Sequence, residues 1–404
     1  SVRLGPWQVG KLCVIPRNGF SFMPPMLEST LPSFWYLNND VFQIEREHIF
    51  MREWLCVGRK EQIPNPGSHR VLDLYGESVL LLRNSDGQLR AFYNVCRHRG
   101  ARLCPDAHDA LGSHGVTLSG GVMESRSIRC PYHAWTYSLD GDLLRAPHLK
   151  AETEIDLANL SLHPVSVASW GGFVFVHLTP DEAPDFPAQI ATTDTQFQRY
   201  PLAELGIGHS ISYEVAANWK VICENYNECY HCGPVHPELC EVVPVFKQRG
   251  GAELDWDRGV PHREGAVTFT ASGTTERRMF PGLNADERIR HKGDLVYPNL
   301  FLSASSDHVA VFVLQAKSAN LTTIDCHFLF ESHEMSKPGF DPSDAVDFWH
   351  KVNCQDWAIC ERVQQGMNSR VHRAGIFSPM EDWNLDIRRY VTDRIGAHVS
   401  DLTE

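Results

Sequence analysis

The sequence has no long apolar run, no basic cluster and few cysteines. Its apolar stretches, such as Phe173 to Val176 and Phe312 to Leu314, are far shorter than the roughly 20 residues that span a bilayer. Lys and Arg form no patch, and the formal net charge is -13, which argues against a phosphate-binding surface. We therefore expect a soluble protein that binds neither a membrane nor nucleic acid.

The N-terminus, SVRLGPWQVG, also lacks the charged and apolar regions of a signal peptide. Twelve cysteines among 404 residues are too few for a disulfide scaffold. We therefore expect a cytoplasmic protein whose cysteines are thiols or metal ligands.

The length predicts at least two domains, because one domain usually holds roughly 100 to 200 residues. Residues 1–52 form an N-terminal segment, expected to pack with the second domain, with a helix over 42–54. Short alternating apolar runs between turns predict a small antiparallel β domain over 53–164. Strand and helix patterns mix over 165–404, so the fold class is α+β.

The larger region contains alternating segments that predict one antiparallel sheet. We expect two functional helices beside it, one over about 219–232 and one over about 344–367, where Asp341-Pro342-Ser343 supplies start signals. The strand-like segments are 211–219, 266–272, 299–305, 308–318 and 322–332.

The strongest pattern in the chain is C-x-H followed by C-x-x-H in the β domain. Cys96 and His98 form the first limb, and Cys130 and His133 form the second. A Rieske two-iron, two-sulfur cluster takes two thiolates on one iron and two imidazoles on the other. A Cys2His2 zinc site uses the same ligands but usually spaces them C-x2-4-C and H-x3-5-H, so the spacing favours the cluster.

A second group of candidate ligands begins with His231 and His236. Gly233-Pro234 between them must end the helix, which lets His236 fold back toward His231. Two imidazoles and one carboxylate form the facial triad of non-haem iron oxygenases, which leaves positions open for oxygen and substrate. The carboxylate must come from elsewhere in the chain.

Asp356 is the candidate carboxylate, because it occupies an apolar position of the helix predicted over 344–367. A buried carboxylate needs a partner, and Asp356 could instead pair with Arg362 or cap backbone amides. Asp344 and Asp347 are competitors, but they lie near the helix start, where acids favour the helix dipole.

Cys229 and Cys232 form a C-x-x-C that, with Cys240, could bind zinc or act in redox exchange. A redox C-x-x-C belongs at the start of a helix, whereas this one lies deep within a predicted helix. We therefore expect Cys229 and Cys232 to be small packing residues.

Several segments closely resemble the catalytic α-subunits of the Rieske non-haem iron oxygenases: CRHRGARL, CPYHAWTYSLDG, SWGGFVFV, ECYHC, YPNLFLS and DWAICERVQQGM. The resemblance covers nearly the whole chain and implies a Rieske β domain beside a helix-grip catalytic domain. It implies that His231, His236 and Asp356 bind the mononuclear iron. In this family a preceding acid bridges an iron-ligating His to a Rieske His of the neighbouring subunit, so the resemblance assigns that role to Glu228 and implies a homotrimer.

The chain departs from this family's pattern in two places. Most members have Asp where this chain has Glu228, and Glu is associated with a branch that acts on quaternary ammonium compounds. In addition, 31 residues separate His98 from Cys130, which indicates an inserted surface loop. Within that insertion, His108 and His114 are expected to be solvated loop residues.

The resemblance implies an oxygenase that uses O2 and electrons from NAD(P)H. No GxGxxG fingerprint or plant-type ferredoxin spacing occurs, so the flavin and NAD(P)H chemistry belongs to a separate reductase. We expect N-demethylation of a quaternary ammonium or betaine compound in a pocket whose aromatic rings attract the cation. Tyr297, Phe301 and Phe312 are candidates, although sheet packing also explains each. The alternatives are an aromatic-ring hydroxylating dioxygenase and a Rieske electron carrier.

Overall fold

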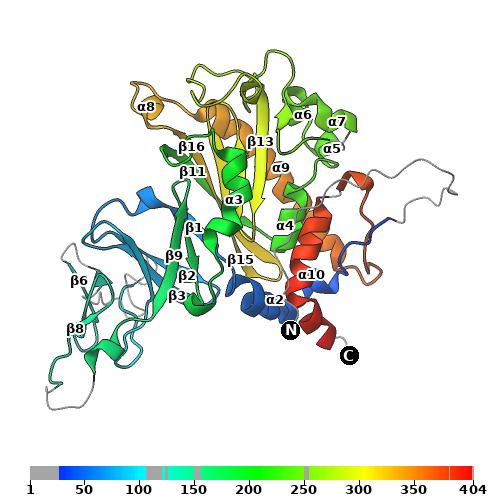
Figure 1. Cartoon of the computed structure of the whole chain (residues 1–404). Helices are drawn as coiled ribbons and strands as arrows, with labels where there is room; N and C mark the ends of the chain where they lie inside the picture. The colour runs from blue at the N-terminus through cyan, green and yellow to red at the C-terminus, as the bar shows by residue number, and fades with distance from the viewer. Residues whose placement is uncertain are drawn as a thin grey trace, which may run out of the picture.

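The chain folds into two regions, each built on an antiparallel sheet of six strands (Figure 1). Helices and antiparallel strands together confirm the α+β class. His108 and His114 lie outside the residues that the computed structural model describes. The described residues are 27–105, 121–122, 126–149, 156–249, 254–381 and 383–402.

The first sheet has the strand order β1-β10-β9-β4-β3-β2. Alternate residues of a strand point to opposite faces, and β3 separates two apolar cores in this way: Leu80 and Leu82 join one cluster, while Val79 and Leu81 join another. The strands of this sheet are β1 (Leu55–Arg59), β2 (His69–Leu74), β3 (Glu77–Arg83), β4 (Leu89–Tyr93), β9 (Pro164–Trp170) and β10 (Phe173–His177).

A smaller sheet covers one face of β3. Ile128, Tyr137 and Leu143 from this sheet share an apolar cluster with Leu80 and Leu82. The cluster also contains both cysteines of the C-x-H and C-x-x-H limbs, so the limbs are anchored in a core rather than left on a surface loop. The strands are β5 (Gly121–Val122), β6 (Ser127–Arg129), β7 (Thr136–Ser138) and β8 (Leu143–Arg145).

The hairpin formed by β9 and β10 belongs to the first sheet. β10 pairs with β1, and β9 pairs with β4. The sequence-based boundary at residue 164 instead assigns this hairpin to the second domain. We propose a boundary after Leu178, because all ladder hydrogen bonds of the hairpin are made with the first sheet.

The second sheet has the order β11-β16-β15-β14-β13-β12, and the long helix α9 packs across it (Figure 1). Trp349 of α9 meets Phe312 of β15, and the side chain of Asn353 lies 3.9 Å from the sulfur of Cys326 on β16. The elements are β11 (Leu205–Val215), β12 (Val260–Pro261), β13 (Arg290–Val296), β14 (Leu300–Ala304), β15 (Val309–Ser318), β16 (Leu321–Glu331) and α9 (Ser343–Met367).

The strand predicted over 266–272 is absent, and turns occupy this segment. Its hydroxyl groups make side-chain hydrogen bonds: Thr268 donates to Asp307, and Thr270 donates to the carbonyl of Thr274 at 2.8 Å. Such bonds offer the backbone an alternative to a sheet ladder, and alternation in the sequence does not reveal them.

The N-terminal segment contacts the second region. Glu45 of α2 forms a buried ion pair with Lys220 of α4, and the helix predicted over 42–54 is α2 followed by a π-helical turn at Arg46–Phe50. No helix of the described residues combines the length and apolar character needed to cross a bilayer. The other α-helices of the described residues are α1 (Phe34–Leu37), α2 (Asn39–Glu45), α3 (Phe186–Phe197), α4 (Trp219–Tyr226), α5 (Cys232–Val235), α6 (Pro237–Val242), α7 (Pro244–Arg249), α8 (Ser332–Met335) and α10 (Asn384–Asp401).

Candidate metal centres and the adjoining cavity

Two loops of the first region share one backbone geometry. The carbonyl of Cys96, after β4, accepts from the N–H of Gly100 at 2.9 Å, and the carbonyl of Cys130, after β6, accepts from Ala134 at 3.1 Å. Gly100 and Ala134 both have positive φ, 74° and 56°, and this conformation is uncommon for Ala. Matched turns at the same position after each cysteine indicate two arms of one site.

Each loop supplies one buried thiol and one exposed imidazole. Cys96 and Cys130 are 3% and 2% exposed, whereas His98 and His133 are exposed and their rings lie 4.7 Å apart. His98 also stacks on Trp135 at 4.9 Å. Thiolates inside and imidazoles outside are the donor arrangement that a Rieske cluster requires, so the residues present fit that group.

The helix predicted over 219–232 is too long. α4 ends at Tyr226, where the N–H of Asn227 bonds back to the carbonyls of Cys223 and Glu224. Asn favours helix ends because its side chain competes for backbone hydrogen bonds. Glu228 and His231 therefore lie in a turn between two helices rather than on a helical face.

This turn and the neighbouring helices bring His231, His236 and Asp356 together. Oδ1 of Asp356 lies 2.7 Å from Nε2 of His236 and 3.2 Å from Nε2 of His231. One donor atom from each residue lies within 4.8 Å of the other two. Among the described residues, this is the single group of three His, Cys, Asp or Glu side chains with that geometry.

The other imidazole nitrogens are held by neighbouring side chains. Nδ1 of His231 lies 2.6 Å from Oε1 of Glu228, and Nδ1 of His236 lies 2.8 Å from Oε1 of Gln355. The amide nitrogen of Gln355 donates to Glu238 at 3.3 Å, which fixes its orientation. Because these oxygens accept, each Nδ1 carries the proton and each Nε2 presents a lone pair to a metal. Gln355 is not identified by the sequence analysis. Its position directly before the predicted ligand Asp356 is the one feature of the sequence that points to it.

The charges in this cluster favour a cation between the side chains. Burial opposes protonation of His231, but the carboxylates of Asp356 and Glu228 outweigh it and raise the pKa of His231 to about 10. Burial also opposes ionisation of Asp356, yet His231 and His236 hold its pKa below the usual range. A divalent metal would supply this positive charge while both imidazoles stay neutral. The donor set fits the facial triad of a mononuclear iron.

The competing carboxylates lie elsewhere. Asp344 binds Arg277 through both oxygens, at 2.6 and 3.0 Å, and Asp347 is exposed. Asp356 is turned toward the two histidines rather than toward Arg362. Of the acids at this helix, Asp356 alone joins the group.

Cys229 and Cys232 are buried in the apolar core, which confirms that they are packing residues. They are joined by a disulfide across the turn, so the prediction that they are thiols is wrong. The thiol of Cys240 lies 3.4 Å from the carbonyl oxygen of Cys232, which is a hydrogen bond rather than a zinc contact. The disulfide braces the turn that carries His231.

A cavity of about 250 Å³ lies beside this triad. Tyr297, Phe301 and Phe312 all line it, while Phe301 and Phe312 are also sheet core. No lysine or arginine is among the described residues of its wall. Sequence reasoning missed other rings in the wall, namely Tyr226, Phe246, Trp256, Phe269, Trp349, Trp357 and Trp383. Further carboxyl groups in the wall belong to Asp257, Asp294 and Asp386.

Two family matches divide the sequence in the same order as the two sites. Residues 53–168 match the family described as the Rieske [2Fe-2S] domain. Residues 202–397 match the ring hydroxylating alpha subunit, catalytic domain. The first match contains the Cys and His limbs, and the second contains the triad.

The chain is similar along most of its length to two curated oxygenase subunits. The glycine betaine monooxygenase oxygenase subunit of Pseudomonas aeruginosa is 29% identical over 388 residues, covering 88% of this chain and 86% of the relative. The carnitine monooxygenase oxygenase subunit of Acinetobacter pittii is 29% identical over 358 residues, covering 86% and 88%. The crystal structure of the quaternary ammonium Rieske monooxygenase CntA in complex with gamma-butyrobetaine matches with a TM-score of 0.69 at 26% identity, covering 92% of this chain and 96% of that one.

Proposed function

We propose, from the premise that the chain belongs to the Rieske non-haem iron oxygenases as a catalytic α-subunit, that it removes an N-methyl group from a quaternary ammonium compound. The cavity wall carries this proposal, because aromatic rings and carboxyl groups line it and no described lysine or arginine does. Ring faces and carboxylates both attract a desolvated ammonium group. Relatives named glycine betaine and carnitine monooxygenase support a substrate of this kind.

The chain is an oxygenase subunit and depends on a separate reductase for electrons. When bound, its two iron groups supply one-electron transfer and the activation of O2. We assign Cys96, His98, Cys130 and His133 to the cluster, and His231, His236 and Asp356 to the mononuclear iron.

The residues around the triad have defined tasks in this reaction. Glu228 and Gln355 hold the Nδ1 protons of His231 and His236, so that both Nε2 atoms face the metal position. The cavity rings exclude water and hold the cation with one methyl group toward the triad. One oxygen atom enters that methyl group, and the other leaves as water with two electrons and two protons. The resulting carbinol loses formaldehyde and a proton, while the amine keeps the electron pair of the broken C–N bond.

A second copy of the chain would complete the electron path. Figure 1 shows β6 and β8, beside the cluster loops, at the lower left of the molecule, and α4 and α5 to the right of the second sheet. Glu228 already accepts from His231, but its carboxylate keeps lone pairs for a second imidazole. We propose a homotrimer in which Glu228 of one copy faces His98 or His133 of the next.

Complementation between inactive variants tests this assembly. Glu228→Gln and His133→Ala should each be nearly inactive alone, and sedimentation should give three copies. Mixed trimers should recover part of the activity, because an intact cluster then meets an intact Glu228. Failure of the mixture, with both variants folded and trimeric, would contradict transfer between copies.

Product analysis tests the reaction. With reductase, NADH and O2, choline and related quaternary ammonium compounds should release formaldehyde in proportion to NADH consumed. The neutral isostere 3,3-dimethylbutan-1-ol should not be turned over, since it has the same shape without the charge. Diol formation from an arene, without formaldehyde from any cation, would favour the ring dioxygenase alternative.

A further inference from the structure

Trp349 forms part of the cavity wall on the same helix as the candidate iron ligand Asp356. Its ring meets Phe269 at 5.3 Å, His291 at 5.9 Å and Phe312 at 6.0 Å between centroids. Residues seven apart on an α-helix share one face. Trp349 and Asp356 therefore border the same space.

The indole of Trp349 is tied to a buried histidine behind the wall. Nε1 of Trp349 donates to Nε2 of His308 at 3.1 Å. An indole N–H can only donate, so Nε2 of His308 accepts and Nδ1 carries the proton. That Nδ1 lies 2.9 Å from Oδ1 of Asp307. The three groups form a directed chain of hydrogen bonds from the indole to a carboxylate.

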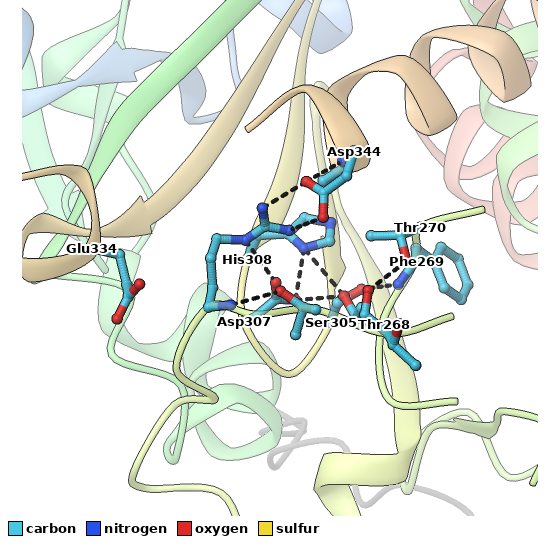
Figure 2. A network of polar contacts seen from close by, with 12 residues as sticks. Thr268, Phe269, Thr270, Ser305, Asp307, His308, Glu334 and Asp344 are labelled. Atoms are coloured by element: carbon cyan, nitrogen blue, oxygen red, sulfur yellow. Dashed lines mark hydrogen bonds and ion pairs between the residues drawn. The ribbon is translucent and has the colours of Figure 1, made fainter. Parts of the chain in front are cut away.

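The carboxylate that ends this chain is itself fully paired, as Figure 2 shows for its contacts with His308 and Thr268. Arg277 donates to Oδ2 of Asp307 at 2.9 Å and binds Asp344 at the start of α9. Burial would raise the pKa of Asp307, but His308 and Arg277 hold it well below the usual range. The carboxylate therefore remains charged behind the imidazole of His308.

A purely structural task explains only part of this network. His308 and Asp307 lie in the hairpin turn between β14 and β15, where the N–H of Ser305 bonds to the carbonyl of His308 at 2.9 Å. Asp307 also accepts a hydrogen bond from the hydroxyl of Thr268 in the neighbouring segment. Neither of these structural contacts requires a hydrogen bond between the imidazole of His308 and Trp349. Burying a chain of polar groups costs free energy unless every group is hydrogen-bonded.

We propose that His308, held by Asp307, positions and polarises the indole of Trp349 as the ring face that receives the cationic group of the substrate. This inference rests on the proposed function. An acceptor at the indole N–H shifts electron density onto the ring, which strengthens the attraction between the ring face and a cation. His308 is thus a positioning residue, and Trp349 is the residue that determines specificity for charge.

The helix geometry leaves room for this arrangement. Seven residues of α-helix correspond to about 10 Å along the axis between Trp349 and Asp356. A cation within about 6 Å of the ring centroid would then have its methyl group on the side of the triad. An ammonium group between the two positions would contact the ring of Trp349 and still direct a methyl group toward the triad.

Equilibrium binding separates this role from simple packing. Choline and 3,3-dimethylbutan-1-ol would be titrated calorimetrically into the anaerobic holoenzyme. His308→Leu should weaken choline binding roughly fivefold to twentyfold and leave the neutral isostere within about twofold. His308→Gln should restore most of the affinity, because an amide accepts from the indole and donates to Asp307. In Trp349→Phe, which has no N–H, adding His308→Leu should cause no further loss.

Trp357 supplies a matched control. It also lines the cavity from α9, but its Nε1 has no hydrogen-bond partner among the described residues. Trp357→Phe should therefore not alter how choline binding responds to His308→Leu. Two results would overturn the role of His308. One is an equal loss of affinity for choline and for the isostere in His308→Leu, and the other is an additive loss of choline affinity in the double variant of Trp349→Phe with His308→Leu. A wild-type enzyme that binds the isostere as well as choline would overturn both this inference and the proposed function.

Discussion

Oε1 of Glu228 lies 2.6 Å from Nδ1 of His231, and the backbone N–H of His231 donates to Oε2 at 3.1 Å. The carboxylate of Glu228 therefore accepts hydrogen bonds from both the imidazole and the backbone of His231. This double contact fixes the orientation of His231 and leaves its Nε2 for the metal.

Replacing Glu228 with Gln should slow electron transfer between the cluster and the mononuclear iron, while both sites keep their metal. The amide keeps the length of the side chain but loses the charge that holds the Nδ1 proton. We expect product formation to fall roughly 10- to 100-fold, while iron, sulfide and reduction of the cluster by the reductase remain near wild type. Rapid-mixing spectroscopy and single-turnover product measurements would check this. Glu228→Asp is the control for charge with a shorter reach. Loss of iron in proportion to activity would contradict a bridging role.

Replacing Asp356 with Ala should remove only the mononuclear iron. The wild-type chain should contain about three irons, two in the cluster and one at the triad, and the variant about two with unchanged sulfide. Asp347→Ala is the matched control, because Asp347 is an exposed acid on the same helix. Metal analysis with sulfide determination gives the result. Three irons in the Asp356 variant would mean that another carboxylate completes the site.

The ligand pattern could be predicted because chemistry restricts it to a few residue types at short spacing. Cys96 with His98, and His231 with His236, each lie in one local segment. Asp356 is predictable because a carboxylate interrupts an apolar stripe. The sequence predicts too late an end for α4, since the apolar pattern continues past the point where Asn227 stops the helix.

The cavity wall and the buried network could not be predicted in this way. Trp349, His308 and Thr268 meet only after the sheet and α9 have packed. Taken alone, the sequence around each of these residues predicts only an ordinary core or turn position. The direction of the hydrogen bonds between them is a property of the tertiary structure, because no periodic pattern in the sequence encodes it.

The charge of the wall predicts a preference between quaternary ammonium substrates. A substrate carboxylate would meet no lysine or arginine among the described wall residues, and it would meet the carboxyl groups of Asp257 and Asp294. Burying an unpaired carboxylate is costly. We expect kcat/KM for choline to exceed that for glycine betaine by roughly tenfold, in keeping with a penalty of about 1.4 kcal/mol. Formaldehyde release at limiting substrate measures this ratio. Equal or faster turnover of the zwitterion would contradict the prediction.

Glu224 should make stability depend on pH. Burial raises the pKa of Glu224 to about 7 from its ordinary value of 4.5, although a hydrogen bond from Tyr36 opposes the shift. The folded state therefore binds this proton more tightly than the unfolded chain does. Its contribution to stability is complete below about pH 4.5 and is lost as the pH rises through 7. Glu224→Gln keeps an acceptor for Tyr36 without the titration. The melting temperature of the variant minus that of the wild type should increase between pH 5.5 and 8. A constant difference over this range would contradict the raised pKa of Glu224.

The buried ion pair of Glu45 and Lys220 should join the N-terminal segment to α4. Both side chains are 0% exposed, and Trp219 also donates to Glu45 at 2.9 Å. Removing one charge leaves the other buried and unpaired, so Glu45→Leu or Lys220→Met should each lower the free energy of unfolding by about 3 to 5 kcal/mol. The double variant Glu45→Leu with Lys220→Met should lose much less, because apolar groups can replace a buried pair. Denaturant titration of the three variants measures this difference. Additive losses in the double variant would show that packing by these side chains, rather than their charge pairing, stabilises the contact.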